Sequence, residues 1–430
     1  MSQTRGPLSR EQACNEGGFD MSETRKTLAT SYHRERISRR AFVAGAGAAA
    51  ATFMVRERGR VHGAEANSKI DLGVIGCGSR GSWIAALFQK HGGYNVVAAA
   101  DYFEDRVERF GEKFNVDPAH RYTGLSCYRK LLEQKLDAVA IESPPFFHPE
   151  QAAAAVDAGR HVFLAKPIAV DVPGCRTIAE SGKKATDARR CFLVDFQTRA
   201  NPLYREAVAR VHDGGIGRIF SGEAAYQTGR LGTKGKGGTP EGRLRNWVFD
   251  IALSGDIIVE QNIHAIDVAT WILDANPVRA YGTGGRTVRT EVGDCWDHYA
   301  VVYFFPNDVP LTFSSKQCGL GYEDIMCRIY GSEGTIDTHY GGPVSITGKT
   351  PYEGGNTGNL YTDGAVVNIA DFYESITNNR WSNPTVEPSV RSNLTSILGR
   401  TAAYQSREVT WDEMMNANEK IDGKLEGLNG

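Results

Sequence analysis

The stretch Ile70-Asp-Leu-Gly-Val-Ile-Gly-Cys-Gly-Ser-Arg-Gly81 decides the fold of this chain. Its first six residues form the apolar run of a short buried strand, which leads into a G-x-G-x-x-G turn made by Gly76, Gly78 and Gly81. The first glycine permits the tight turn, the second lets a pyrophosphate approach the backbone, and the third lets the next helix pack closely. Ser79 and Arg80 fall at the start of that helix, where free N–H groups attract phosphate. The pattern predicts a dinucleotide site, although spaced glycines also occur in ordinary turns.

The residues that follow favour the dinucleotide interpretation. A second apolar run, 96–100, ends at Asp101, about where a Rossmann unit places the acid that binds a ribose hydroxyl. Tyr102 comes next, where an NADP enzyme would often carry a cation. We therefore expect NAD as the cofactor, with NADP less favoured.

Composition indicates an ordinary globular protein of two domains. The 430 residues are 41% hydrophobic and 23% charged, and the net charge of −2 gives no reason to expect nucleic acid as a partner. The eight cysteines form no C-x-x-C pair, so we expect neither a disulfide framework nor a metal site. We divide the chain into a targeting segment (1–66), a Rossmann domain (67–195) and a C-terminal α/β domain (196–430).

The first 66 residues have the features of an export signal. Arg39 and Arg40 precede a weakly apolar run, 41–55, as in a twin-arginine (Tat) signal, and Ala64-Glu65-Ala66 offers a cleavage site. Arginines at 56, 58 and 60 stand between the run and that site and make cleavage less certain than export. A disordered basic tail is the alternative interpretation. The signal predicts a periplasmic protein, and we expect no membrane span after it.

From residue 69 to about 195, short apolar runs alternate with helical patterns, which is typical of a parallel sheet covered by helices. Expected strands are 70–75, 96–100, 138–141, 162–164 and 191–194, and expected helices include 151–158 and 177–185. Such sheets bind ligands beyond the carboxyl ends of their strands. Candidate cofactor contacts at those ends are Ser143, Pro144, His148 and Lys166, although a lysine there is more often a solvated surface charge.

Beyond residue 201 the pattern changes to a helix, 203–212, and alternating strand-like runs at 218–226, 278–282, 298–305, 311–317 and 325–329. These predict a second, largely antiparallel sheet. One continuous helix, 260–273, interrupts them and places Glu260, His264 and Asp267 on one face. A carboxylate one turn before a histidine favours a working pair over a lone core histidine. We expect a closing helix at 389–406 and then a polar tail.

Two glycine-rich segments are expected to be loops. Residues 227–245 carry five basic side chains that could cover a substrate as a lid, although a solvated loop is the more common outcome. Residues 341–364 are rich in Gly, Tyr and Asn and carry no clear periodicity.

From about 69 to 410 the chain resembles the Gfo/Idh/MocA oxidoreductases, named for glucose–fructose oxidoreductase and inositol dehydrogenase. The resemblance rests on several motifs in order: the turn at 76–81, Asp101, Ser-Pro-Pro with His148, Gly159-Arg-His-Val leading into Ala-Lys-Pro at 165–167, the 260–267 helix, and Gly331-Ser-Glu-Gly-Thr335. It implies a Rossmann domain followed by an open-faced α/β domain, and a homodimer or homotetramer that often forms through the sheet. It also implies NAD(P)-dependent hydride transfer at a secondary alcohol of a sugar or polyol.

The resemblance also implies residue roles. Lys166 matches a lysine that contacts cofactor and substrate, and His264 matches the histidine that takes the hydroxyl proton. Glu260 would hold the imidazole or the substrate. Arg199, Asn262 and Trp247 are the candidate substrate contacts.

This sequence departs from the family pattern at two positions. Ala165 replaces the glutamate of Glu-Lys-Pro, so that a polar contact near the cofactor is lost. Asn262 replaces a glycine, so that a side chain is expected to enter the pocket. Three functions stay open: an oxidoreductase that retains its cofactor, a glycosidase that works by transient oxidation and elimination, and a carbohydrate-binding relative without turnover.

Overall fold

The computed structural model describes residues 69–235 and 237–430. Residues 67–430 form one compact unit. The expected Tat signal and its cleavage site lie outside the described residues.

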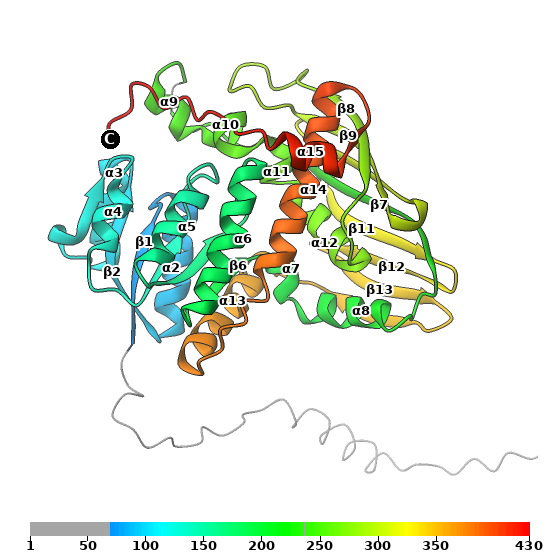
Figure 1. Cartoon of the computed structure of the whole chain (residues 1–430), viewed down its shortest axis with the longest axis horizontal. Helices are drawn as coiled ribbons and strands as arrows, with labels where there is room; N and C mark the ends of the chain where they lie inside the picture. Colours follow the sequence, from blue (N-terminus) through cyan, green and yellow to red (C-terminus); the bar gives the residue numbers. More distant parts are fainter. Residues whose placement is uncertain (1–68, 236) are drawn as a thin grey trace, which may run out of the picture. The chain divides into compact units, whose positions relative to one another are not determined.

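A six-stranded parallel sheet forms the first half of this unit (Figure 1). Its strands lie in the order β3-β2-β1-β4-β5-β6, the order of a dinucleotide-binding sheet. Chain order reverses between β1 and β4, so the ligand crevice of such a sheet lies beyond these two strand ends. The strand bounds are Ile70–Ile75 (β1), Tyr94–Asp101 (β2), Arg121–Thr123 (β3), Ala138–Ile141 (β4), His161–Ala165 (β5) and Phe192–Asp195 (β6).

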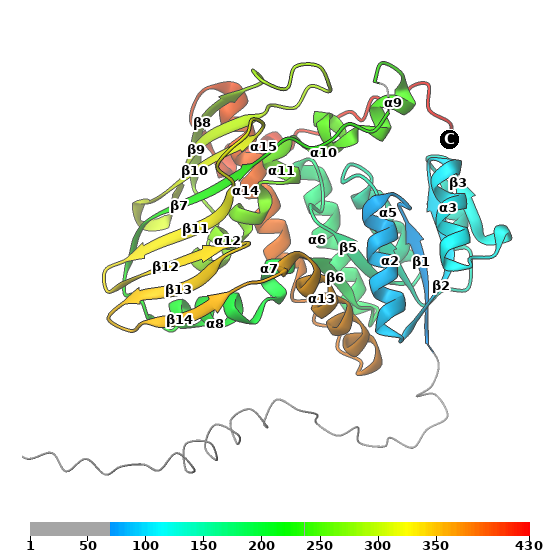
Figure 2. The ribbon, with the colours of Figure 1, turned by 180° about the vertical axis from the view of Figure 1, so that it is seen from behind.

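Helices cover both faces of this sheet because its strands are apolar on both sides. On one face, Ile84 of α2 and Phe372 of α13 belong to the same buried cluster as Leu72 of β1, and on the other, Ile178 of α6 belongs to the cluster that contains Ile75. Figure 2 shows α2 and α13 in front of the sheet. The helix bounds are Ser79–His91 (α2), Glu104–Phe114 (α3), Cys127–Leu132 (α4), His148–Asp157 (α5), Val172–Asp187 (α6) and Leu360–Thr377 (α13).

A nine-stranded sheet forms the second half, in the order β14-β13-β12-β11-β7-β10-β9-β8-β15. All neighbours pair antiparallel except β10 and β7. The largely antiparallel second sheet predicted from the sequence is thus confirmed. The bounds are Ile219–Thr228 (β7), Arg279–Gly285 (β8), His298–Phe305 (β9), Val309–Gln317 (β10), Asp324–Gly331 (β11), Gly334–His339 (β12), Pro343–Gly348 (β13), Tyr352–Asn356 (β14) and Val409–Thr410 (β15).

One long helix, α14 (Val386–Gln405), joins the two halves. It packs against α6 on one side and against α12 and β8 on the other, as Figure 1 shows for the orange helix. The remaining helices are α7 (Gln197–Ala200), α8 (Pro202–His212), α9 (Pro240–Arg245), α10 (Ile251–Ser254), α11 (Ile257–Glu260), α12 (Ile263–Leu273) and α15 (Trp411–Ala417). Among the described helices, none is long and apolar enough to cross a membrane.

Two expectations about local structure are wrong. Residues 341–364 are not a loop: they contain β13 and β14 and the start of α13, because Val344 and Ile346 alternate inward onto the sheet. The expected continuous helix 260–273 is broken into α11 and α12. The N–H of Asn262 bonds to the carbonyl of Ile257, five residues back, and this wide turn ends α11.

Candidate active site

The glycine turn after β1 is built as a cradle for a phosphate. Gly76 has φ +96°, and a Cβ there would lie 2.5 Å from the carbonyl carbon of Glu142. A Cβ on Gly81 would lie 1.7 Å from the Gly76 oxygen, so this glycine is needed for helix packing. At Gly78, by contrast, the nearest atom would be Arg106 Nη1 at 3.7 Å. Protein contacts alone do not require glycine at 78, and a pyrophosphate lying against the backbone does. The residues present therefore fit a dinucleotide.

A pocket extends from this turn along the ends of β1, β2 and β4. Asp101 lines it, with its Oδ2 accepting the N–H of Cys77 at 2.8 Å and its Oδ1 accepting that of Phe103 at 3.0 Å. These bonds fix the carboxylate, which keeps free lone pairs for ribose hydroxyls. The glycine turn, Asp101, Ser143 and Pro144 thus line one pocket, together with the unpredicted residues Tyr102, Phe103, Arg106 and Gln151.

His148 does not line this pocket. Its Nδ1 lies 2.8 Å from the carbonyl oxygen of Pro167, and its Nε2 lies 2.7 Å from that of Ser143. Burial lowers the pKa of His148 to about 4, so the ring is neutral and only one of the two nitrogens carries a hydrogen to donate. The expectation of a cofactor contact is corrected: His148 ties two strand-end turns together.

A second cleft, of about 630 Å³, opens beside the first, and both are lined by Arg80, Glu142, Ser143, Lys234 and Trp247. Its volume is in the range of small-molecule sites. Lys166, Glu260 and His264 all line it, although they come from the end of β5, from α11 and from α12. The structure therefore brings together the three residues that the sequence proposed for catalysis.

Lys166 is held by the end of α11. Its Nζ donates to the main-chain oxygen of Glu260 at 2.7 Å and lies 3.6 Å from Oε1 of the same residue. Burial lowers the pKa of Lys166, and the Glu260 carboxylate opposes that shift. The ammonium is thus fixed in the cleft by one residue.

His264 lies in the first turn of α12, and its Nδ1 is buried without a partner among the described residues. Burial, and then the charges of Lys166 and Arg80, lower its pKa well below the ordinary value. The imidazole is therefore neutral, and one of its two ring nitrogens carries no proton. The structure describes no hydrogen bond from Glu260 to His264, although both residues line the cleft. Glu260 was expected to hold either the imidazole or the substrate. Its described contact is with Lys166, and because its side chain lines the cleft, a contact with the substrate stays a prediction.

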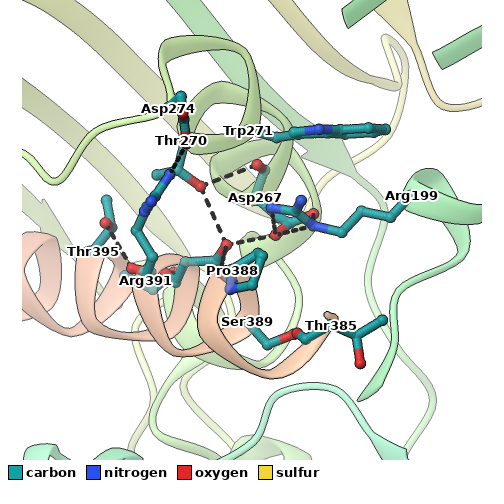
Figure 3. A network of polar contacts seen from close by, with 12 residues as sticks. Arg199, Asp267, Thr270, Trp271, Asp274, Thr385, Pro388, Ser389, Arg391 and Thr395 are labelled. Carbon is teal, nitrogen blue, oxygen red and sulfur yellow. Dashed lines mark hydrogen bonds and ion pairs between the residues drawn. The ribbon is translucent and has the colours of Figure 1, made fainter. Parts of the chain in front are cut away.

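Arg199 and Asp267 form an ion pair with each other and do not line the cleft (Figure 3). Arg199 Nε lies 2.9 Å from Asp267 Oδ2, and Nη2 lies 2.9 Å from Oδ1, while Ser392 of α14 donates to the same carboxylate. The guanidinium also lies 5.0 Å from the Trp271 ring. The expectation that Arg199 faces the substrate is therefore corrected, because this pair joins α7, α12 and α14.

Asn262 is fully buried and does not line the cleft, whereas its neighbour Gln261 does. The expectation that Asn262 enters the pocket is corrected by the turn that ends α11.

Sequence reasoning also missed Tyr226 and Tyr340, which line the cleft from the second sheet and the turn after β12. The Tyr340 ring lies 5.4 Å from that of His264, and its hydroxyl has no partner among the described residues.

Arg80 crosses from the glycine turn to three other elements. Its Nε lies 2.9 Å from Glu142 Oε2, Nη1 donates to Tyr361 at 2.9 Å, and Nη2 pairs with Asp195. These partners follow β4, begin α13 and end β6, so Arg80 joins the turn to other parts of the unit. Arg80 also lines the nucleotide pocket, and its contact with the cofactor stays a prediction. The signal available in the sequence was Glu142, a charged residue directly after a buried apolar strand.

The chain matches known families in both halves. A model described as the oxidoreductase family, NAD-binding Rossmann fold, matches residues 70–191, and one described as the GFO/IDH/MocA C-terminal domain matches residues 204–337. The chain is 27% identical to inositol 2-dehydrogenase 2 of Saccharopolyspora erythraea, over 66% of this chain and 76% of that protein. It is 24% identical to the scyllo-inositol 2-dehydrogenase (NAD(+)) of Bacillus subtilis, over 62% and 73% of the two chains.

Solved structures share the fold. The aldose-aldose oxidoreductase of Caulobacter crescentus superimposes with a TM-score of 0.64 at 18% identity, covering 80% of this chain and 99% of that one. The glycine cradle, the sheet order and both family matches indicate the same family of NAD-binding oxidoreductases. The protein belongs to the Gfo/Idh/MocA oxidoreductases and is an NAD-binding enzyme that acts on CH–OH groups.

Proposed function

We propose that this enzyme oxidises a secondary hydroxyl of a sugar or polyol and returns the hydride to the same or a second sugar without releasing its nucleotide. NAD, when bound, accepts or returns hydride at its nicotinamide ring. His264 takes the hydroxyl proton, because an alcohol carbon gives up hydride only as that proton leaves. Lys166 stabilises the developing alkoxide, and Glu260 holds Lys166 in place. The names of the inositol dehydrogenases support a polyol or sugar as the substrate.

The observation that carries the retained cofactor is a strap beside the nucleotide pocket, made of residues 229–235, residues 237–245 and the tail 418–430. Lys234 lines the pocket and places Nζ 3.4 Å from Ser79 Oγ in the glycine turn. Arg245 pairs with Asp105 at 2.6 Å and lies over the Phe103 ring at 3.9 Å. The segment first considered as a lid or a solvated loop thus lies over the cofactor side of the site.

The C-terminal tail holds this segment in place. Arg243 donates to the carbonyl oxygen of Gly423 at 2.8 Å, and the N–H of Asn429 lies 3.2 Å from the Tyr102 hydroxyl beside the pocket. Leu125 N–H in turn bonds to the Asn429 carbonyl at 3.1 Å. These contacts tie the tail to Tyr102 and Leu125, which line the nucleotide pocket, and we expect them to slow the exit of a bound nucleotide, which supports a cycle without exchange.

The test uses purified protein without added NAD, given myo-inositol together with glucose. We expect many equivalents of oxidised polyol and reduced aldose per enzyme, followed by mass spectrometry, and NAD recovered from the denatured protein. One equivalent of product that increases only with added NAD would contradict retention and leave an ordinary dehydrogenase. Release of 4-nitrophenol from 4-nitrophenyl glycosides would instead indicate the glycosidase, and bound sugar without any product the non-catalytic relative.

We also propose that the protein is exported by the Tat pathway and acts in the periplasm. A Tat substrate crosses the membrane folded and could carry its nucleotide, and no dependable NAD pool would exist outside. The sequence Ser38-Arg39-Arg40-Ala41-Phe42 supports this proposal. Replacing Arg39 and Arg40 by Lys should leave the protein in the cytoplasm on cell fractionation, and unchanged export would refute it.

A further inference from the structure

A carboxylate stands at the point where the strand order of the parallel sheet reverses. Glu142 directly follows β4, whose last residue Ile141 pairs with Ile75 of β1 and with Leu164 of β5. Glu142 is therefore placed between the glycine turn and Ala165. Its side chain is 0% exposed and lines both the nucleotide pocket and the substrate cleft.

This carboxylate lacks the hydrogen bonds that a buried charge requires. Neither of its oxygens accepts a hydrogen bond from the residues that the structure describes. Arg80 Nε forms an ion pair with Oε2 at 2.9 Å but no hydrogen bond with it, and the other Arg80 nitrogens bond to Asp195 and Tyr361. A buried acceptor without a donor is costly, and a ligand hydroxyl in the pocket would supply one.

Glu142 lies beside Ala165, one of the two positions at which this sequence departs from the family pattern. The family resemblance expects a glutamate before Lys166, and this chain has alanine there. Neighbouring strands lie about 4.8 Å apart, so side chains that follow β4 and end β5 reach the same space. Both Glu142 and Ala165 line the cleft.

The location also selects which part of NAD lies near Glu142. Asp101 marks the adenosine ribose at the end of β2, and the glycine turn marks the pyrophosphate. Glu142 lies on the other side of that turn, where the nucleotide pocket meets the cleft that holds Lys166 and His264. This junction corresponds to the nicotinamide half of the cofactor.

We propose that Glu142 binds NAD by accepting a hydrogen bond from a hydroxyl of the ribose next to the nicotinamide, and that it supplies from β4 the carboxylate that Ala165 lacks on β5. The interaction holds the nicotinamide end beside Lys166. It rests on NAD binding and does not depend on the identity of the sugar or on retention of the cofactor.

The test compares NADH with ADP, which lacks the second ribose, by calorimetry on protein freed of nucleotide with activated charcoal. Glu142→Gln keeps the shape of the side chain, and we expect it to weaken NADH binding at least tenfold while ADP binding changes less than twofold. ADP binding also verifies that the variant is folded. Glu112→Gln, on the exposed side of α3, is the matched control and should change neither affinity.

The second arm moves the carboxylate. Glu142→Ala should weaken NADH binding as Glu142→Gln does, and Glu142→Ala with Ala165→Glu should recover most of the loss. Unchanged NADH affinity in Glu142→Ala, which has no acceptor, or an equal loss for NADH and ADP, would overturn the proposal. Failure of Ala165→Glu to restore any affinity would overturn the equivalence of the two positions.

Discussion

Lys166 Nζ donates a hydrogen bond to the main-chain oxygen of Glu260 at 2.7 Å. The end of α11 thus fixes in the cleft the ammonium group of the residue that follows β5. A main-chain acceptor does not titrate, so it accepts this hydrogen bond whether or not the Glu260 carboxyl group is ionised. The same contact ties the two halves of the unit together at the site of chemistry.

Replacing Lys166 by Met should therefore affect turnover and not nucleotide binding. We expect turnover to fall by about 10²-fold, because the charge that stabilises the alkoxide is lost. NADH affinity should change little, since the phosphate cradle lies at the glycine turn. Rates and calorimetric NADH affinities of Lys166→Met and of the exposed control Lys183→Met would test this. An equal loss of NADH affinity would assign Lys166 to cofactor binding instead.

Asp267 should matter for stability and not for the substrate. Its side chain is 0% exposed and holds Arg199, which is 14% exposed (Figure 3). Asp267→Asn leaves the guanidinium without its partner, and we expect the free energy of unfolding to fall by about 3 kcal/mol in urea titrations.

A double-mutant cycle with Arg199→Ala measures the coupling of the pair. The KM for the sugar should stay within twofold in all three variants. A raised KM with unchanged stability would restore Arg199 to the substrate site.

The sequence was sufficient for the elements that carry a local signal. Buried parallel strands are continuous apolar runs, and β1 and β4 therefore begin and end where predicted. Arg199 shows why other features were not predictable: its partner Asp267 lies 68 residues away, and nothing local to either residue indicates the pairing. Glu142 was predictable in part. The sequence shows a charged residue directly after a buried strand, but only the structure shows that this carboxylate has no hydrogen-bond donor among the described residues.

Glu142 should make stability depend on pH. Burial raises its pKa to about 7, opposed by Arg80 and Lys166 and reinforced by Asp195, whereas an unfolded glutamate titrates near 4.3. The folded state thus binds the proton more tightly, and this residue lowers the free energy of unfolding as pH rises from about 4.3 to 7.

Glu142→Gln removes that dependence. Its free energy of unfolding relative to the wild type should therefore rise by about 3 kcal/mol between pH 4 and pH 8, measured on nucleotide-free protein. Arg80, Lys166 and Asp195 are present in both proteins, so the difference isolates Glu142. Parallel curves for the two proteins would show that the carboxylate is charged throughout.

The tail, which contacts residues at the edge of the nucleotide pocket, should govern how fast the cofactor leaves. Leu425 and Leu428 pack with Phe103 and Leu244, and Arg243 bonds to the carbonyl oxygens of Gly423 and Lys424. A chain that ends at Asn418 loses these contacts but keeps both sheets and α15. We expect NADH to dissociate at least tenfold faster, measured as the decay of its fluorescence after excess ADP is added, while the initial rate with NAD in solution is maintained.

Gly427→Ala is a milder variant, because the φ of +80° at this position disfavours a side chain, and it should accelerate release to a smaller degree. Equal release rates in the full and shortened chains would show that the tail does not retain the nucleotide, and retention would then rest on the pocket alone.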